Sequence, residues 1–337
     1  MTPSYLVRTN RRETAASRYP FSPYPTGWYL VAESDSLASG EVVPLRRFGR
    51  DLVVLRTDAG VAVVADAHCP HLGAHVGHGG VVEGEGIRCP FHGWRFGVDG
   101  RCEDVPYGSD RRPPRVGLST YPVRETSGLV FMHFSEAGRA PTWHLPDVPE
   151  WGADGWVGYR THTWIVRMHA QELIENAPDT AHFAHVHRLP GTPAAECGTD
   201  GHIYRQRSYF AETGETFTSQ EAHGIGLIWL RSKGPNGDTV LLATITPVDE
   251  ERCELRWEFL CFEGSGATQL SAETEATLER VCAQNEADIP IWEHKVYRDR
   301  APLVAGDGPI NVVRRWARQF YETPIAERNV GGLRTDR

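Results

Sequence analysis

The sequence predicts an α+β protein in which an all-β N-terminal part precedes a mixed part built on an antiparallel sheet. Short β-branched segments separated by turn residues follow one another from Gly27 onward, which is typical of an all-β domain. The stretch 140–156 is rich in Pro, Gly and Trp, so we expect it to be a linker, and segments of alternating polarity and helix-like segments follow it. A chain of 337 residues is long enough for about two such domains.

The N-terminal strands are expected where β-branched and aromatic residues cluster. They lie at Trp28–Ala32, Val42–Leu45, Leu52–Leu55, Val61–Val64 and Gly128–Phe134. Residues 1–20 are polar and rich in Arg, so we expect them to be loosely ordered. We therefore predict an N-terminal extension at 1–26, an all-β domain at 27–140 and a second domain at 141–337.

The second domain is expected to combine helices with a half-buried antiparallel sheet. The expected strands are Tyr204–Phe210, Glu215–Ala222, Thr239–Thr246 and Cys253–Phe262, and the expected helices are Gln171–Arg188, Ser271–Ala287 and Val312–Tyr321. Ser271, followed by Glu273 and Glu275, is a suitable helix start. Pro290 should kink or interrupt that helix because proline has no N–H to donate.

Composition excludes several classes of protein. Lys plus Arg total 35 and Asp plus Glu total 44, and the resulting net charge of −9 disfavours nucleic acid or an anionic membrane as the main partner. Apolar stretches such as Ile225–Leu230 are far shorter than a membrane span, and no secretory signal is visible near Met1. Seven Cys, an odd number, argue against a disulfide framework and indicate a reducing cytoplasm.

The first chemical pattern joins two short segments that each contain one Cys and one His. Cys69 and His71 are followed after seventeen residues by Cys89 and His92, giving C-x-H and C-x2-H. Two thiolates and two imidazoles on paired loops can hold a metal centre. A zinc site is the main alternative, although zinc sites usually pair two Cys on one loop and two His on the other.

The second pattern lies in the segment 175–187. Two His and one carboxylate on one face of a metal leave open positions for dioxygen and substrate, as in non-haem iron oxygenases. On an ideal helix, His182 and His185 are about 60° apart, whereas His182 and His187 are about 140° apart. Helix geometry alone therefore prefers His185 as the second ligand, while His187 needs a bulge or helix end near 184–187.

Together these patterns resemble the Rieske non-haem iron oxygenases over nearly the whole chain. The mixed Cys–His loops resemble a Rieske [2Fe–2S] centre, and Asn176, Asp179, His182 and His187 match the family pattern N-x2-D-x2-H-x3/4-H. Further matching segments are 288–295, 307–309 and 314–321, which resemble the branch of 3-ketosteroid 9α-hydroxylases and cholesterol 7-desaturases. The chain departs from that branch in being shorter and in carrying Ala67-His68 before the first motif, where an aromatic residue is common.

The resemblance implies a role for each motif residue. Cys69 and Cys89 would bind one iron of the cluster, and His71 and His92 the other. The mononuclear Fe(II) would be bound by three residues, His182, His187 and Asp288.

Some of these implied assignments have alternatives. Glu286 and Glu293 are neighbouring alternatives to Asp288, which could itself be a solvated helix residue. Asp179, the candidate catalytic residue together with Asn176, would pass the electron between a mononuclear-iron His and a Rieske His of the neighbouring subunit. A local cap or salt bridge is the alternative for Asp179.

The resemblance also implies an activity. It is that of a terminal oxygenase with a helix-grip catalytic domain, which uses O2 to oxidise a C–H bond of a hydrophobic polycyclic substrate. Hydroxylation is favoured over desaturation, and a steroid is the first choice of substrate. A non-steroid natural product or aromatic, oxidised by demethylation, N-oxygenation or oxidative cyclisation, is the alternative.

The resemblance also implies that the chain forms a homotrimer. The implied partner is a separate flavin and iron–sulfur reductase, with or without a ferredoxin. That reductase would deliver electrons from NAD(P)H, since no G-x-G-x-x-G dinucleotide fingerprint follows a strand in this chain. Two readings of other classes stay open, a Rieske electron carrier without catalysis and a zinc-stapled protein that binds an apolar ligand. An iron analysis distinguishes the oxygenase, with about three irons per chain, from the electron carrier, with about two.

Overall fold

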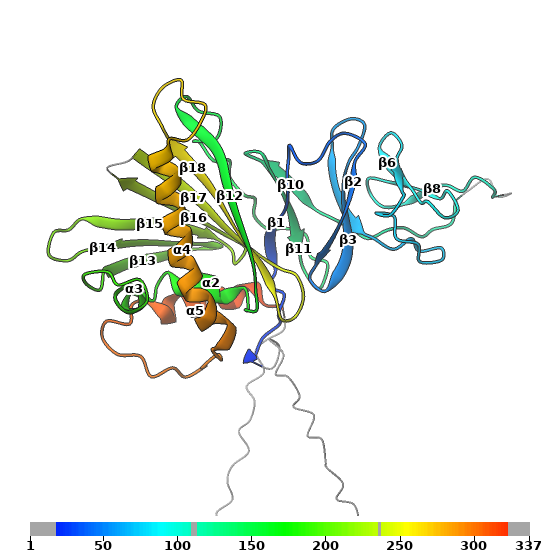
Figure 1. Ribbon diagram of the computed structural model, residues 1–337. Coiled ribbons are helices and arrows are strands. Elements are labelled where there is room, and N and C mark those ends of the chain that lie inside the picture. Colours follow the sequence, from blue (N-terminus) through cyan, green and yellow to red (C-terminus); the bar gives the residue numbers. More distant parts are fainter. Residues whose placement is uncertain (1–17, 109–112, 235–236, 323–337) are drawn as a thin grey trace, which may run out of the picture.

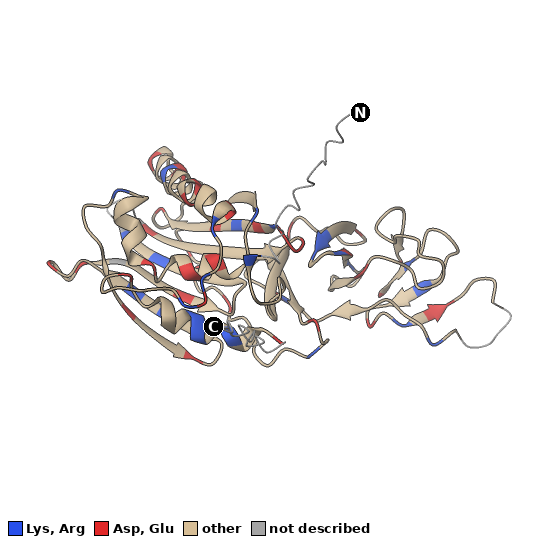
Figure 2. Cartoon of the chain, turned by 90° about the horizontal axis from the view of Figure 1, so that it is seen from below, with Lys and Arg blue, Asp and Glu red and all other residues tan. Residues whose placement is uncertain are grey.

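The computed structural model describes residues 18–108, 113–234 and 237–322. The expected N-terminal extension therefore lies largely outside the described residues. Two β-rich parts form an elongated molecule, with the strands β5–β8 at one end and the helices near the other (Figure 1). In the view of Figure 2, Lys, Arg, Asp and Glu are distributed over both parts. Within the described ranges, no helix has the length and hydropathy of a membrane span.

The N-terminal part is all-β, as predicted, and contains three small antiparallel sheets with the orders β1-β11-β10, β2-β3-β4-β9 and β5-β6-β7-β8. Its strands are β1 (Gly27–Glu33), β2 (Val42–Arg47), β3 (Arg50–Arg56), β4 (Ala62–Asp66), β5 (Val81–Val82), β6 (Gly86–Arg88), β7 (Arg95–Gly97), β8 (Cys102–Asp104), β9 (Thr120–Tyr121), β10 (Val123–Thr126) and β11 (Leu129–Phe134). The loop after β4 and the turn after β6 carry the first pair of motifs.

The C-terminal part is built on a seven-stranded antiparallel sheet with the order β12-β18-β17-β16-β15-β14-β13. Its strands are β12 (Trp156–Val166), β13 (Ala194–Asp200), β14 (Ile203–Tyr209), β15 (Thr216–His223), β16 (Leu227–Gly234), β17 (Gly237–Pro247) and β18 (Cys253–Phe262). Three of them, β12, β13 and β16, were not expected from the sequence. The helices are α2 (Gln171–Asn176), α3 (Thr180–His185), α4 (Ala272–His294) and α5 (Ile310–Ala317), followed by the 3-10 turn η1 (Arg318–Phe320).

The seven-stranded sheet has a different core on each face. Because side chains alternate along a strand, Trp229 of β16 and Leu242 of β17 pack with Trp28 of β1 on one face. On the other face, Ile228 and Ala243 share a core with residues of α4, which lies across the sheet (Figure 1). The stretch 140–156 that we expected to be a linker contributes buried side chains to the first of these cores, so it is packed rather than free.

Two helices differ from the sequence prediction. The expected single helix 171–188 is two short helices, because Pro178 has no N–H to donate and Asp179 adopts a non-helical conformation that caps α3. The expected interruption at Pro290 is also wrong, since α4 continues to His294. Proline removes one hydrogen bond there, while Trp292, 2% exposed, anchors the last turn in the core.

Candidate metal centres and substrate cavity

The two Cys–His segments fold into the same kind of turn. The backbone N–H of Cys69 donates to Ala74 O at 2.8 Å, and that of Cys89 donates to Trp94 O at 2.8 Å. The glycine four positions after each Cys has a positive φ of 77° or 71°, which an L side chain rarely adopts. The sequence therefore builds two matching loops that present one thiol and one imidazole each.

These loops bring all four side chains to one place. Cys69 and Cys89 are buried and free of disulfides, and the rings of His71 and His92 lie 4.8 Å apart between centroids. Burial and the neighbouring Cys89 thiol raise the pKa of Cys69 to about 11. Nδ1 of His71 is buried without a partner among the described residues. Two adjacent buried thiols and an unpartnered imidazole nitrogen fit a bound metal cluster, because a cation would stabilise the thiolates.

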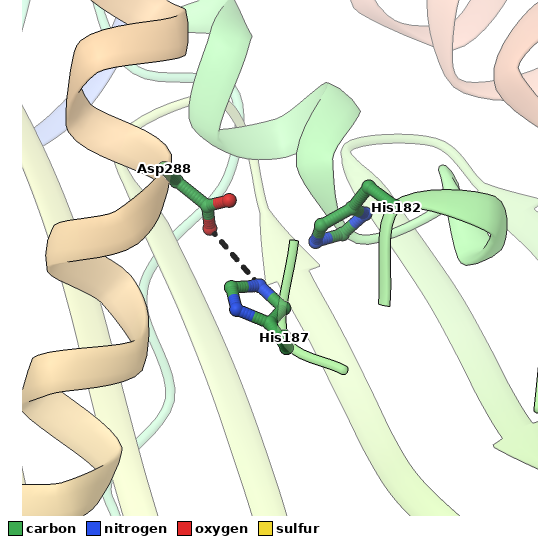
Figure 3. A group of neighbouring side chains, drawn as sticks. All are labelled: His182, His187 and Asp288. Carbon is green, nitrogen blue, oxygen red and sulfur yellow. Dashed lines mark ion pairs between the residues drawn. The ribbon is translucent and has the colours of Figure 1, made fainter. Parts of the chain in front are cut away.

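The second candidate centre assembles from three segments. His182 comes from α3, His187 follows the end of that helix, and Asp288 comes from α4 (Figure 3). One ligand atom from each lies within 4.8 Å of the other two, and His187 Nε2 is 3.3 Å from Asp288 Oδ2. Because α3 ends at His185, the chain turns and carries His187 back to the site, while His185 stays exposed.

The neighbouring carboxylates are used elsewhere. Glu286 is exposed and accepts a hydrogen bond from Trp164 Nε1 at 3.2 Å. Glu293 accepts from the backbone N–H of Arg167 at 3.4 Å. Of the three carboxylates weighed for this role, the structure therefore brings Asp288 to the two His.

Hydrogen bonds orient the candidate ligands. His182 Nδ1 donates to the backbone oxygen of Asp179, because a carbonyl can only accept, and Nε2 therefore carries the lone pair, with Asn176 Nδ2 3.4 Å away. Asn176 Nδ2 donates to Asp288 Oδ2 at 3.1 Å. Burial lowers the pKa of His187, which favours its neutral, metal-binding form. Burial also raises the pKa of Asp288, and a divalent cation would compensate for the desolvation of this carboxylate. The residues present fit a metal site.

Asp179 is the N-cap of α3. Its Oδ1 accepts the backbone N–H of His182 at 3.4 Å, so the cap that sequence analysis kept as an alternative is present. Its backbone oxygen holds the imidazole of the same residue. Asp179 therefore positions His182 twice, whatever further role its charge has.

A cavity of about 330 Å³ opens next to the second centre. Asn176, His187 and Asp288 lie at one side of it, and the exposed residues Arg231 and Gln284 lie at its rim. Most of the remaining wall is apolar, and it comprises Leu173, Ala177, Phe183, Leu189, Ile228, Leu230, Leu241, Ala243, Trp257, Phe259, Leu278 and Val281. Sequence reasoning did not find these lining residues. The α4 members recur every three or four positions before Asp288, which is the signal that could have indicated them.

Comparison with known proteins places this architecture in a family. The Rieske [2Fe-2S] domain matches residues 27–122, and the 3-ketosteroid 9α-hydroxylase C-terminal domain matches residues 132–321. A cholesterol 7-desaturase of Caenorhabditis elegans is 31% identical over 336 residues, which is 88% of this chain and 77% of the relative. The oxygenase component of a 3-ketosteroid-9-alpha-monooxygenase of Mycobacterium tuberculosis is 30% identical over 336 residues, 92% and 85% of the two chains.

The fold is also that of solved structures. Dicamba monooxygenase bound to dicamba superposes with a TM-score of 0.68 at 18% identity, covering 87% of this chain and 96% of that one. At this identity the likeness concerns the fold alone. It agrees with the predicted combination of an all-β Rieske domain and a catalytic domain with a large antiparallel sheet.

The fold and the family matches define a Rieske-type oxygenase, an oxidoreductase that reacts with O2. The chain belongs to the branch of this family whose C-terminal domain is that of the 3-ketosteroid 9α-hydroxylases. The predicted family is thus confirmed. Its cofactors are a Rieske [2Fe–2S] cluster and a mononuclear non-haem iron, and its electrons come from a separate reductase.

Proposed function

We propose that this oxygenase oxidises a C–H bond of a steroid-like polycyclic substrate, with hydroxylation favoured over desaturation. The observation that carries the proposal is the apolar cavity of about 330 Å³ beside His187 and Asp288. A volume of this size and a wall of this composition are typical of sites for drug-sized apolar ligands. The relatives named for 3-ketosteroid and cholesterol oxidation support the substrate class.

The proposal assigns the metal ligands within the chain. Cys69, His71, Cys89 and His92 hold the [2Fe–2S] cluster in the domain 27–140, and His182, His187 and Asp288 hold the mononuclear iron in the domain 141–337. The iron supplies reductive activation of O2 when bound. The backbone oxygen of Asp179 orients the His182 imidazole, the Asn176 amide donates a hydrogen bond to the Asp288 carboxylate, and the apolar wall of the cavity excludes water.

Electron transfer is proposed to run between subunits of a homotrimer. The strands β5–β8, which border the Cys–His loops, lie at one end of the elongated molecule, whereas α3 and α4 lie in the other part (Figure 1). The N-terminal domain packs on one face of the seven-stranded sheet and α4 packs on the opposite face. A head-to-tail cyclic assembly would place one subunit's loops beside its neighbour's iron site. Asp179 would then connect the two centres. The reductase, with or without a ferredoxin, would draw on NAD(P)H, and the seven free Cys are consistent with a cytoplasmic location.

Metal analysis of anaerobically purified protein is the first test. We expect about three irons per chain, a brown colour and a rhombic EPR signal of the reduced cluster. Cys69→Ser should remove the colour, whereas Cys102→Ser, at another buried Cys of the same domain, should keep it. Zinc in a colourless protein would overturn the assignment.

The substrate class is tested separately. The holoprotein with a surrogate reductase and NADH is offered a panel of 3-ketosteroids, sterols and non-steroid polycyclic aromatics. Product that retains one atom of ¹⁸O from labelled O2 would support hydroxylation, and a new double bond without label would indicate desaturation. Turnover of the aromatics with no turnover of any steroid would contradict the proposed class.

A further inference from the structure

Two hydrogen-bond donors in the cavity wall have no partner within the described ranges of the chain. The wall is mostly apolar, but Nδ2 of Asn285 and Nε1 of Trp257 are buried and unpartnered among the described residues. An indole N–H and an amide NH2 group can only donate. A buried donor without an acceptor costs about 1–3 kcal/mol. A ligand in the cavity could therefore supply the acceptor that these two donors need.

Asn285 is the more sharply placed of the two donors. It lies on α4 three positions before Asp288, so both side chains project from the same face of the helix, about 4.5 Å apart along its axis. The residue is only 4% exposed. Asn is also a poor helix former, so a buried Asn in mid-helix has no local reason to be there. Its amide group is positioned about one helical turn from a candidate iron ligand.

The charges around the cavity restrict the chemical class of the ligand further. In the part of the chain that the structure describes, no Lys or Arg is among the buried lining residues, and Arg231 at the rim pairs with Glu150 at 3.0 Å. A carboxylate ligand would therefore meet no buried Lys or Arg in the cavity, and the charge of a bound iron would be partly offset by the Asp288 carboxylate. A neutral acceptor such as a ketone, an ether or a hydroxyl oxygen suits a neutral amide donor.

We propose that Asn285 donates a hydrogen bond to a neutral oxygen of an otherwise apolar polycyclic substrate, and that this bond sets which C–H bond faces the iron site. The inference deepens the proposed function and depends on it for the existence of a substrate. Because Asn285 is buried and the rim is formed by Gln284 and Arg231, the oxygen-bearing part of the substrate enters the inner cavity. Trp257 can donate a second hydrogen bond from the sheet side. Asn285 is thus a positioning and specificity residue.

The test uses matched ligands that differ only in oxygen. The first pair is androst-4-ene-3,17-dione and androst-4-ene, and the second is 9-fluorenone and fluorene, all presented from cyclodextrin. Dissociation constants are measured calorimetrically on the anaerobic holoprotein. We expect the wild type to prefer the ketone by about tenfold in at least one pair.

The variants separate a hydrogen bond from packing. Asn285→Leu keeps a similar volume without the donor, and the ketone preference should fall to about one. Asn285→Gln keeps the amide and should retain part of the preference. Val281 lies about one turn before Asn285 on the same face of α4. Val281→Ala should weaken the binding of both members of a pair alike and leave the ratio of their dissociation constants unchanged.

Each outcome bears on the inference. The inference is overturned if the wild type prefers the ketone in neither pair, or if the Asn285→Leu variant keeps the preference. It is also overturned if the protein binds no member of either pair. Preference in the fluorenone pair alone supports Asn285 but contradicts a steroid substrate. In turnover, Asn285→Leu should spread oxidation over several carbons and raise KM more than it lowers kcat. A purely structural role would leave the product position unchanged.

Discussion

Asn176 donates its side-chain amide to Asp288 Oδ2 at 3.1 Å, although 112 positions separate the two residues. The same Nδ2 lies 3.4 Å from His182 Nε2. Asn176 is the last residue of α2 and Asp288 belongs to α4, so this contact connects α2 to a helix that carries a candidate iron ligand. A hydrogen bond to a charged group contributes about 1.5–3 kcal/mol.

Asn176→Leu should therefore weaken the binding of the mononuclear iron without affecting the cluster. Loss of a hydrogen-bond partner of a ligand typically lowers metal affinity by about 10–100-fold. The measurement is iron retained against a chelator series, with the visible spectrum of the cluster as internal control. Unchanged retention would mean that the amide does not support Asp288.

His187→Ala and His185→Ala form a matched pair for the ligand assignment. Only His187 lies beside Asp288, whereas His185 is exposed. We expect His187→Ala to lower the iron content from about three to about two per chain, and His185→Ala to keep about three. The opposite pattern would show that the ligand has been assigned wrongly.

Asp179→Asn separates a cap from a charge. Asn caps helices about as well as Asp, so α3 and the His182 imidazole should stay in place. Both metals should be retained, while product formed per NADH should fall by about tenfold or more if the charge connects the two centres. Normal coupling would limit Asp179 to the structural role seen here.

Gly308→Ala should disturb the mononuclear site from a distance. A Cβ at Gly308 would lie 1.9 Å from Pro178 O, in the break between α2 and α3. Gly306 also has a positive φ, but a Cβ there meets nothing within 4 Å. Gly308→Ala should thus be about 1–3 kcal/mol more destabilising than Gly306→Ala and should release the mononuclear iron first. Thermal unfolding and iron content measure both effects; equal behaviour of the two variants would refute the steric explanation.

Acid should destabilise the protein through His169. Its buried ring accepts the backbone N–H of Gln171 at Nδ1 and donates from Nε2 to Ser22 O at 2.9 Å. Burial lowers its pKa to about 4, whereas the unfolded chain has a value of about 6.5. Between about pH 4 and pH 6.5 the unfolded state binds a proton that the folded state does not bind. The contribution of His169 to the free energy of unfolding is therefore fully present above about pH 6.5 and is lost as the pH falls toward about 4.

The measurement compares unfolding at pH 7 and pH 5. His169→Gln should lose about 2 kcal/mol less than the wild type over this interval. His185→Gln, at an exposed His, is the control and should follow the wild type. An equal slope for His169→Gln would show that another group carries the acid sensitivity.

Patterns that are local in sequence determined a large part of the architecture. The Cys–His loops, the glycines within them and the alternating strands specify their own conformations over a few residues. Ser271 acts as the N-cap of α4 as expected, accepting from the backbone N–H of Thr274 at 3.2 Å. The motif residues also indicated the family.

Some elements depended on contacts that a local pattern does not contain. The strand β16 has an apolar side chain on both faces, because one face packs on α4 and the other on the N-terminal domain, so it lacks a clear alternation. Pro290 remains helical because Trp292 is buried in the core. In each case tertiary packing outweighs the local preference.

The sequence by itself determined the class of the protein, its two candidate metal centres and the residue types at them, since these lie in short motifs. Only the tertiary structure decided that α3 ends before His187 and that Asp288 meets it from another helix. It also decided that Asn285 lines a cavity of about 330 Å³ and that its Nδ2 has no hydrogen-bond partner in the part of the chain that the structure describes. Such features arise from long-range packing of α4 on the sheet, which brings together groups that are far apart along the chain.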